Sequence, residues 1–253
     1  MFETHFAALV IGYAAAVGGW LLLDRFFPEV WPASDPTTFD HPWRATGAAL
    51  LGVVAVLLVG QLYVRGWLLP EEGSLAPILG AINQILIFGP VLLVLVIRKE
   101  PASSAWLSRR RLSARLGAGA ALAVLALGVY TLARADADGL PSVLGRIVTY
   151  DRLDEAVQVF LEDLTIAILF VRFAAALGPR KATALVAFLF AAGHIPALLA
   201  GGAPWIELTL LLRDVLLGIA LITVLQRSRD IVWFWFVHFT MDMSQFRAVI
   251  FGE

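Results

Sequence analysis

Acidic and histidine side chains interrupt three apolar segments in the C-terminal part of the chain. Glu162 and Asp163 are adjacent, His194 lies on the next segment, and His238 and Asp242 are four residues apart on the last one. Carboxylates and imidazoles inside a bilayer form hydrogen bonds between helices or line a polar cavity. Inside a bilayer, each ionisable group costs from about 2.5 to more than 10 kcal/mol. Groups retained there are expected to face one another, so we predict that Glu162, His194, His238 and Asp242 line one cavity.

Helical spacing relates these residues to their neighbours. His238 and Asp242 project from the same helix face, one turn apart. Phe190 and His194 share this spacing, so the Phe190 ring is expected to pack beside His194 and to fix the orientation of the imidazole.

The adjacent acids need a counter-charge, because two carboxylates in a low-dielectric site repel each other strongly. Arg213 lies about midway along its apolar segment. We expect Arg213 to reach toward Asp163 or Asp214 across the helix interface. Arg172 is expected to face the inner membrane interface.

Three short motifs resemble the CAAX protease and bacteriocin-processing (CPBP, or Abi) family of intramembrane proteases: Glu162-Asp163, Phe190-x-x-x-His194 and His238-x-x-x-Asp242. That family is described by E-E-x-x-x-R, F-x-x-x-H and H-x-x-x-(N or D), in this order. The second and third motifs match fully. The first departs twice, because Asp163 replaces the second Glu and Ala167 stands where Arg is expected. The resemblance covers roughly residues 156–246.

The resemblance implies a glutamate-type endopeptidase without a resident cofactor, acting on a peptide or membrane-protein substrate. In the prenyl-protein endopeptidase branch of the family, the first Glu activates water and the first His assists it. The second His and its partner stabilise the tetrahedral oxyanion. These roles fall here on Glu162, His194, His238 and Asp242, with Asp163 as the second acid of the first motif.

Three other classes of function are compatible with the same residues. One is a transporter with a proton relay, for which the sequence shows no paired broken helices. The departures at Asp163 and Ala167 favour a non-catalytic member, either an immunity protein or a structural subunit bound to other membrane subunits. His194, His238, Glu162 and Asp242 together are also a chemically sensible Zn²⁺ ligand set.

Composition places these segments in a lipid bilayer. Hydrophobic residues make up 60% of the 253 positions and charged residues 15%, where soluble domains carry about 25% charged residues. Mean hydropathy is +0.82. A net charge of −1 argues against binding to nucleic acid, and the absence of cysteine excludes disulfides and thiolate chemistry.

The apolar segments predict an all-α, polytopic membrane helix bundle with about eight transmembrane helices. Each segment is long enough to cross a core of about 30 Å. They cover roughly residues 6–23, 46–64, 75–97, 117–133, 156–178, 182–200, 205–225 and 231–250. We interpret the chain as a single membrane domain (1–253), with scaffold helices in 1–133 and site-bearing helices in 156–250. The acidic connection 134–155 leaves room for a short surface helix.

Lysine and arginine are distributed unequally between the two sides of such a bundle. The connections on one side hold twelve of them and those on the other side hold five. Because basic loops stay in the cytoplasm, this distribution predicts that both termini lie outside it. We expect the chain to be a multi-pass protein in a bacterial inner membrane.

Overall fold

The computed structural model describes residues 2–32, 37–134, 139–200 and 205–245, and in these ranges all regular secondary structure is helical. The first half contains α1 (Phe2–Phe26), α2 (Pro42–Val64), α3 (Ala76–Ile97), α4 (Leu112–Ala133) and α5 (Gly139–Ile147). The second half contains α6 (Leu153–Leu177), α7 (Pro179–Gly193), α8 (Ile195–Ala200), α9 (Trp205–Ser228) and α10 (Ile231–Gln245). Single 3₁₀ turns lie at Pro28–Val30, Gly73–Leu75, Ala102–Ala105 and Tyr150–Arg152. The prediction of an all-α fold is confirmed.

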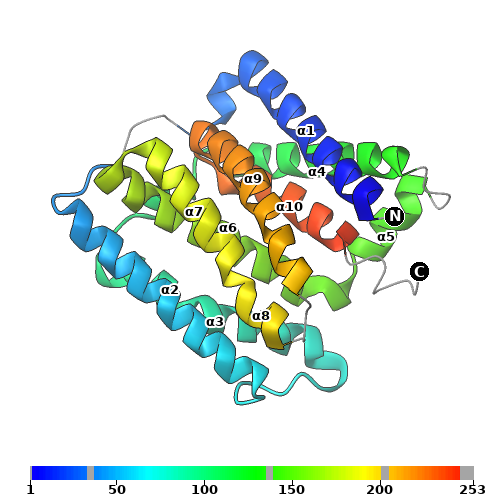
Figure 1. Ribbon diagram of the computed structural model, residues 1–253. Coiled ribbons are helices and arrows are strands. Elements are labelled where there is room, and N and C mark those ends of the chain that lie inside the picture. Colours follow the sequence, from blue (N-terminus) through cyan, green and yellow to red (C-terminus); the bar gives the residue numbers. More distant parts are fainter. Residues whose placement is uncertain (1, 33–36, 135–138, 201–204, 246–253) are drawn as a thin grey trace.

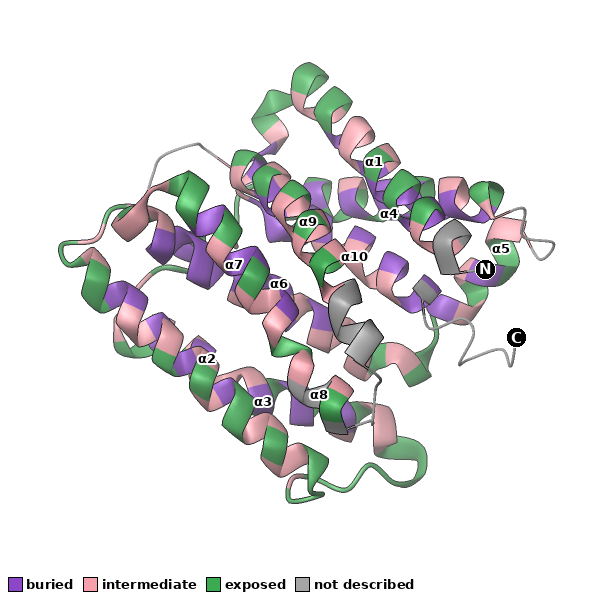
Figure 2. Ribbon diagram, viewed as in Figure 1, coloured by how far each residue is buried: buried purple, intermediate pink, exposed green. Residues whose placement is uncertain are grey.

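Four of the described helices are long and apolar enough to cross a membrane. They cover His5–Phe26, Pro42–Val64, Gly73–Ile97 and Leu112–Ala133, so they correspond to the first four predicted segments. Large apolar side chains are exposed on them, including Leu51, Leu58 and Val96. Figure 2 shows exposed residues along the outer faces of α2 and α3. Outward apolar side chains at this density are typical of a surface that contacts lipid.

Helix α6 lies at the centre of the bundle. It packs against α2 and α3 on one side and against α7 and α10 on the other, and α9 packs on α7. Helix α10 also packs against α4, and α4 packs against α1 (Figure 1). The pair α2–α3 and the pair α1–α4 therefore lie on opposite sides of α6 and α10.

The contact between α4 and α10 depends on a glycine. A Cβ atom added at Gly119 would lie 2.8 Å from the Cα atom of Trp233. Small residues that let helix backbones approach this closely are common in membrane bundles. Gly119 therefore fixes the depth at which α10, which carries His238, lies in the bundle.

The predicted segment 182–200 is interrupted at His194. Helix α7 ends at Gly193, His194 is its C-cap residue, and α8 restarts at Ile195. Pro196 has no backbone N–H to continue a helical ladder, and the residue before a proline disfavours the helical conformation. The histidine thus lies at a helix end instead of on a continuous face.

The short surface helix expected in 134–155 is α5, which buries Val143 and Ile147.

Candidate functional site

The first and third motifs meet through a hydrogen bond between α6 and α10. Nδ1 of His238 lies 2.8 Å from Oδ1 of Asp163. The Asp163 side chain is completely buried and that of His238 is 14% exposed. A carboxylate accepts hydrogen bonds, so the His238 Nδ1–H is the donor and Nε2 points away from Asp163. The sequence placed Asp242 beside His238 as its partner, and the structure gives this contact to Asp163.

Aromatic rings hold the His238 imidazole. The ring centroid of Phe234, one turn earlier on α10, lies 5.4 Å from that of His238, and Phe234 in turn stacks on Tyr13 of α1. Phe190 of α7 approaches His238 edge-on at 6.4 Å. With one face packed and one nitrogen bonded, the imidazole has a fixed orientation before any ligand arrives.

His194 is oriented by Phe190, as the spacing predicted. The two rings meet edge to face with centroids 5.0 Å apart. Nδ1 of His194 also lies 3.0 Å from the backbone oxygen of Phe190. Because a carbonyl oxygen accepts only, Nδ1 carries the proton and Nε2 keeps its lone pair in the neutral ring. Phe190 therefore contacts both histidines.

Glu162 and Asp242 border this pair without a direct hydrogen bond to either histidine among the described contacts. Glu162 accepts a 2.9 Å hydrogen bond from Nε2 of Gln158, one turn earlier on α6. Both carboxylates are half-buried and close enough to His238 to interact with it electrostatically, and Asp242 interacts in the same way with His194. The structure thus gathers all five predicted residues on neighbouring parts of α6, the α7 end and α10.

Arg213 does not supply the expected counter-charge. Within the described part of the chain, neither Asp163 nor Asp214 lies within ion-pair distance of its guanidinium. The Arg213 guanidinium instead lies 5.1 Å above the ring of Phe6 on α1. Its interaction with Asp214 is electrostatic at longer range. Helix α9 packs on α7 and makes no extensive contact with α6 among the described residues.

Arg172 is buried instead of facing the membrane interface. Its side chain is completely buried and forms an ion pair with Glu100, in the connection between α3 and α4. It also donates to the backbone oxygen of Ile168 at 2.9 Å and to Ser104. The sequence carried no signal for this contact, since the two charges are 72 residues apart and Glu100 belongs to a loop. The pair anchors the far end of α6.

A second buried ion pair anchors the start of α10. Arg115 of α4 and Asp230 are both fully buried, with Nη1 and Oδ1 2.6 Å apart. Oδ1 of Asp230 also accepts from the backbone N–H of Val232 at 2.9 Å, which caps α10. Burial raises the pKa of Asp230 to about 6, although Arg115 acts in the opposite direction. This pair was not predictable from the sequence, because Arg115 is one of six basic residues in the range 98–116.

No three histidine or acidic side chains converge as a metal-binding group within the residues that the structure describes. Glu162, His194, His238 and Asp242, the possible Zn²⁺ ligands, therefore lie near one another but do not converge on one point.

Comparison with known proteins found no matching family model, no matching curated protein and no matching solved structure.

Proposed function

We propose that this chain is a multi-pass membrane endopeptidase of the glutamate type, similar to CPBP-family proteases, that cleaves a peptide bond at or near the membrane. The observation that supports this most is the hydrogen bond between Asp163 and His238. It joins the first and third motifs, and Glu162 lies next to Asp163 in the chain. Residues brought together from distant segments, in an environment that penalises charge, are typical of a functional site.

In the proposed mechanism Glu162 is the general base. It takes a proton from a water molecule, whose oxygen attacks the carbonyl carbon of the scissile peptide bond. The proton then passes to the leaving amine as the carbon–nitrogen bond breaks. The hydrogen bond from Gln158 leaves the second carboxylate oxygen of Glu162 to face the water. His194 assists through Nε2, since Phe190 holds the Nδ1 proton.

His238 is the proposed oxyanion donor. The Asp163 carboxylate stabilises the protonated ring and keeps Nδ1 as its own donor, so that the Nε2–H points toward the developing negative charge. Asp242 lies close enough to add to the stabilisation of the imidazolium. This arrangement gives the second acid of the first motif the orienting role and leaves the first acid free for chemistry.

The later helices are also proposed to cross the membrane. We infer that α6, the segment formed by α7 and α8, α9 and α10 cross the bilayer beside α1 to α4, which gives eight spans. Asp163, Arg172 and His238, on α6 and α10, are paired and largely buried within the protein, which reduces the cost of placing them in a bilayer. The expected setting is a bacterial inner membrane.

Detection of new peptide termini tests the proposed activity. The purified protein, reconstituted in vesicles, is incubated with a membrane proteome of its host, and new N-termini are identified by mass spectrometry. Wild-type protein and the surface variant Glu72→Gln are expected to yield the same set of cleavages, whereas Glu162→Gln and His194→Ala yield none while unfolding at the wild-type temperature. Cleavage that persists in both site variants would refute the proposal.

A second candidate is a non-catalytic subunit of a membrane complex. It is favoured by Ala167 at the position of the motif arginine, together with the distance of Arg213 from Asp163. Among the described contacts, no lysine or arginine lies within ion-pair distance of Glu162 or Asp163. Affinity purification from native membranes separates the two candidates. Fixed stoichiometry with other subunits, without any Glu162-dependent cleavage, supports the subunit.

A further inference from the structure

The carboxylate of Asp163 has one oxygen that is not hydrogen-bonded by any of the described residues. Oδ1 accepts from Nδ1 of His238, whereas Oδ2 is fully buried and has no donor within hydrogen-bonding distance. A buried carboxylate oxygen without a donor is costly, because it has given up its contact with water. The site therefore calls for a further donor, which the three sequence motifs do not supply.

Tyr13 of α1 brings a phenol hydroxyl to this part of the bundle. Tyr13 is only 5% exposed. Its ring stacks on that of Phe234, with centroids 6.4 Å apart and planes inclined by 25°. The Phe234 ring in turn lies 5.4 Å from that of His238. Three neighbouring rings thus connect Tyr13 to the histidine that Asp163 holds.

Helix α1 approaches α10 closely at this level. A Cβ atom added at Gly12 would lie 2.9 Å from Sδ of Met241, the residue before Asp242. The Tyr13 hydroxyl is close enough to Asp163 and Asp242 to interact electrostatically with both, and it forms no direct hydrogen bond with either. The phenol and the two carboxylates therefore enclose a small polar place between α1, α6 and α10.

These three groups match the hydrogen-bonding capacity of one water molecule. A phenol donates one hydrogen bond, and ionised carboxylates only accept. A water molecule between them accepts from Tyr13 and donates its two hydrogens to Asp163 and Asp242, which makes the three hydrogen bonds typical of a buried water. It also separates two carboxylates that would otherwise repel each other.

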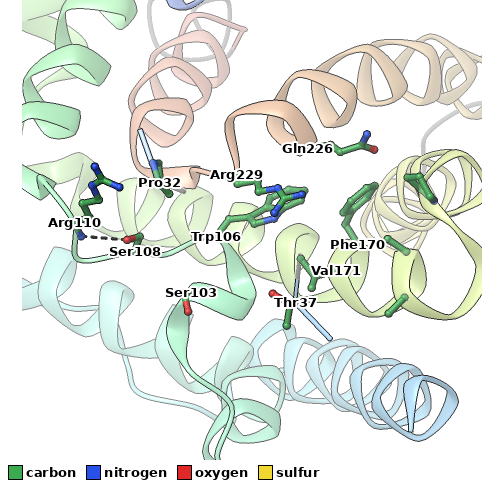
Figure 3. Close-up of a pocket in the computed structure, with 13 residues that line it drawn as sticks. Pro32, Thr37, Ser103, Trp106, Ser108, Arg110, Phe170, Val171, Gln226 and Arg229 are labelled. Atoms are coloured by element: carbon green, nitrogen blue, oxygen red, sulfur yellow. Dashed lines mark hydrogen bonds between the residues drawn. The ribbon is translucent and has the colours of Figure 1, made fainter. Parts of the chain in front are cut away.

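The place beside Tyr13 is separate from a cavity of about 570 Å³ near the far end of α6 (Figure 3). Phe170 and Val171 of α6 and Trp106 line that cavity, and neither Tyr13 nor a carboxylate of the site belongs to its described lining. A molecule in that cavity would therefore not replace a water molecule beside Tyr13.

We propose that Tyr13 is a positioning residue of the site, whose hydroxyl bonds Oδ2 of Asp163 and the carboxylate of Asp242 through one water molecule. With both of its oxygens bonded, the Asp163 carboxylate is fixed in rotation and holds the His238 ring with Nε2 toward the oxyanion. This role rests on the proposed peptidase function. It places one side chain of the N-terminal half in the site.

Infrared spectroscopy tests the contact without a substrate. The full-length protein is made by cell-free synthesis with ¹³C in the aspartate side-chain carboxyl, and the wild-type spectrum is subtracted from that of Tyr13→Phe. Loss of the donor is expected to shift a labelled carboxylate band, and the shift should be absent when both proteins also carry Asp163→Asn and Asp242→Asn. The control Tyr150→Phe removes an exposed hydroxyl that donates to the backbone oxygen of Ser74. An equal shift in the control, or none in Tyr13→Phe, would overturn the proposal.

Kinetics on a substrate identified as above test the positioning role. Tyr13→Phe is expected to lower kcat about tenfold, the effect of one lost hydrogen bond to a charged group, and to leave KM unchanged. In an Asp163→Asn background the same substitution should cause no further loss, because it acts through Asp163. A wild-type kcat, or a tenfold loss that persists in that background, would overturn the role. If the wild-type protein cleaves nothing, the peptidase function fails, and the infrared shift still decides whether Tyr13 is bonded to the two aspartates.

Discussion

Asp163 on α6 and His238 on α10 are 75 residues apart in the chain and share a hydrogen bond of 2.8 Å. The carboxylate is completely buried and the imidazole nearly so. A buried acid bonded to Nδ1 of a histidine selects the tautomer of the ring and stabilises its protonated form.

Replacement of this acid tests its orienting role. In Asp163→Asn the hydrogen-bond geometry is preserved but the charge is lost, so the His238 imidazolium loses its stabilisation. We expect the rate of any Glu162-dependent cleavage to fall about 100-fold, measured by mass spectrometry on a substrate identified as above. The surface variant Asp151→Asn should cleave at the wild-type rate. A wild-type rate in Asp163→Asn would show that Asp163 does not orient a reacting group.

Two glycines on α4 provide a matched pair for helix packing. Gly119→Ala places a Cβ atom 2.8 Å from the backbone of Trp233, which forces α4 and α10 apart and costs about 1–3 kcal/mol. Gly117→Ala meets nothing within 4 Å and should be neutral or stabilise the helix by up to about 1 kcal/mol. Thermal unfolding in detergent measures both. Equal melting temperatures for the two variants would contradict the close approach.

The Arg172–Glu100 ion pair should contribute strongly to stability. Arg172→Met leaves a mostly buried carboxylate without its partner, and breaking a buried pair costs about 3–5 kcal/mol. Because Glu100 keeps 11% exposure and a second contact with Arg98, we expect the lower end of this range. The control Lys99→Met changes the same charge at an exposed position and should unfold at the wild-type temperature. Similar melting curves for both variants would show that Arg172 is not anchored.

Asp230 should make stability depend on pH. Its pKa of about 6 in the folded protein exceeds the ordinary aspartate value of about 3.9. Between these values the folded state holds a proton that the unfolded state releases, so stability falls as pH rises from about 4 to about 6 and then levels off. Denaturant unfolding at several pH values measures this slope. In Asp230→Asn the contribution disappears, and an unchanged slope would assign the pH dependence to another group.

The absence of cysteine from the chain makes the predicted orientation directly testable. Single cysteines at Glu72 and Arg109, in the connections before and after α3, are treated with a membrane-impermeant maleimide in intact cells. The basic connections are expected in the cytoplasm. Glu72→Cys should therefore react in intact cells, and Arg109→Cys only after permeabilisation. The reverse pattern would invert the orientation.

The extent of the helices was largely predictable because apolar length and proline mark their limits. Pro42 and Pro179 open α2 and α7, where a missing N–H has no cost. The break at His194 escaped prediction because hydropathy continues across it and the effect of Pro196 is local. The length of the apolar segment 182–200 could not show that it forms two helices, α7 and α8.

The residues proposed for the site came from the sequence, but the pairing of Asp163 with His238 did not. The cost of charge in lipid and the resemblance to the CPBP motifs together selected Glu162, Asp163, His194, His238 and Asp242. Helical spacing favoured Asp242 as the partner of His238, whereas contact across the α6–α10 interface favours Asp163. The charges that anchor the helices, Arg172 and Arg115, find partners in distant loops, and spacing along one helix contains no information about such contacts.

The central position of α6 has a consequence for the order of assembly during synthesis. Among the described residues, α1 packs on α4 and α2 packs on α3, but neither pair makes extensive contact with the other. They are joined through α6 and α10, which leave the ribosome later. A nascent chain that stops after α4 therefore holds two separate helix pairs, α1–α4 and α2–α3, with the surfaces that will receive α6 and α10 still uncovered. Insertion of α10 joins α4 to α6, and it brings His238 to Asp163 in the same step.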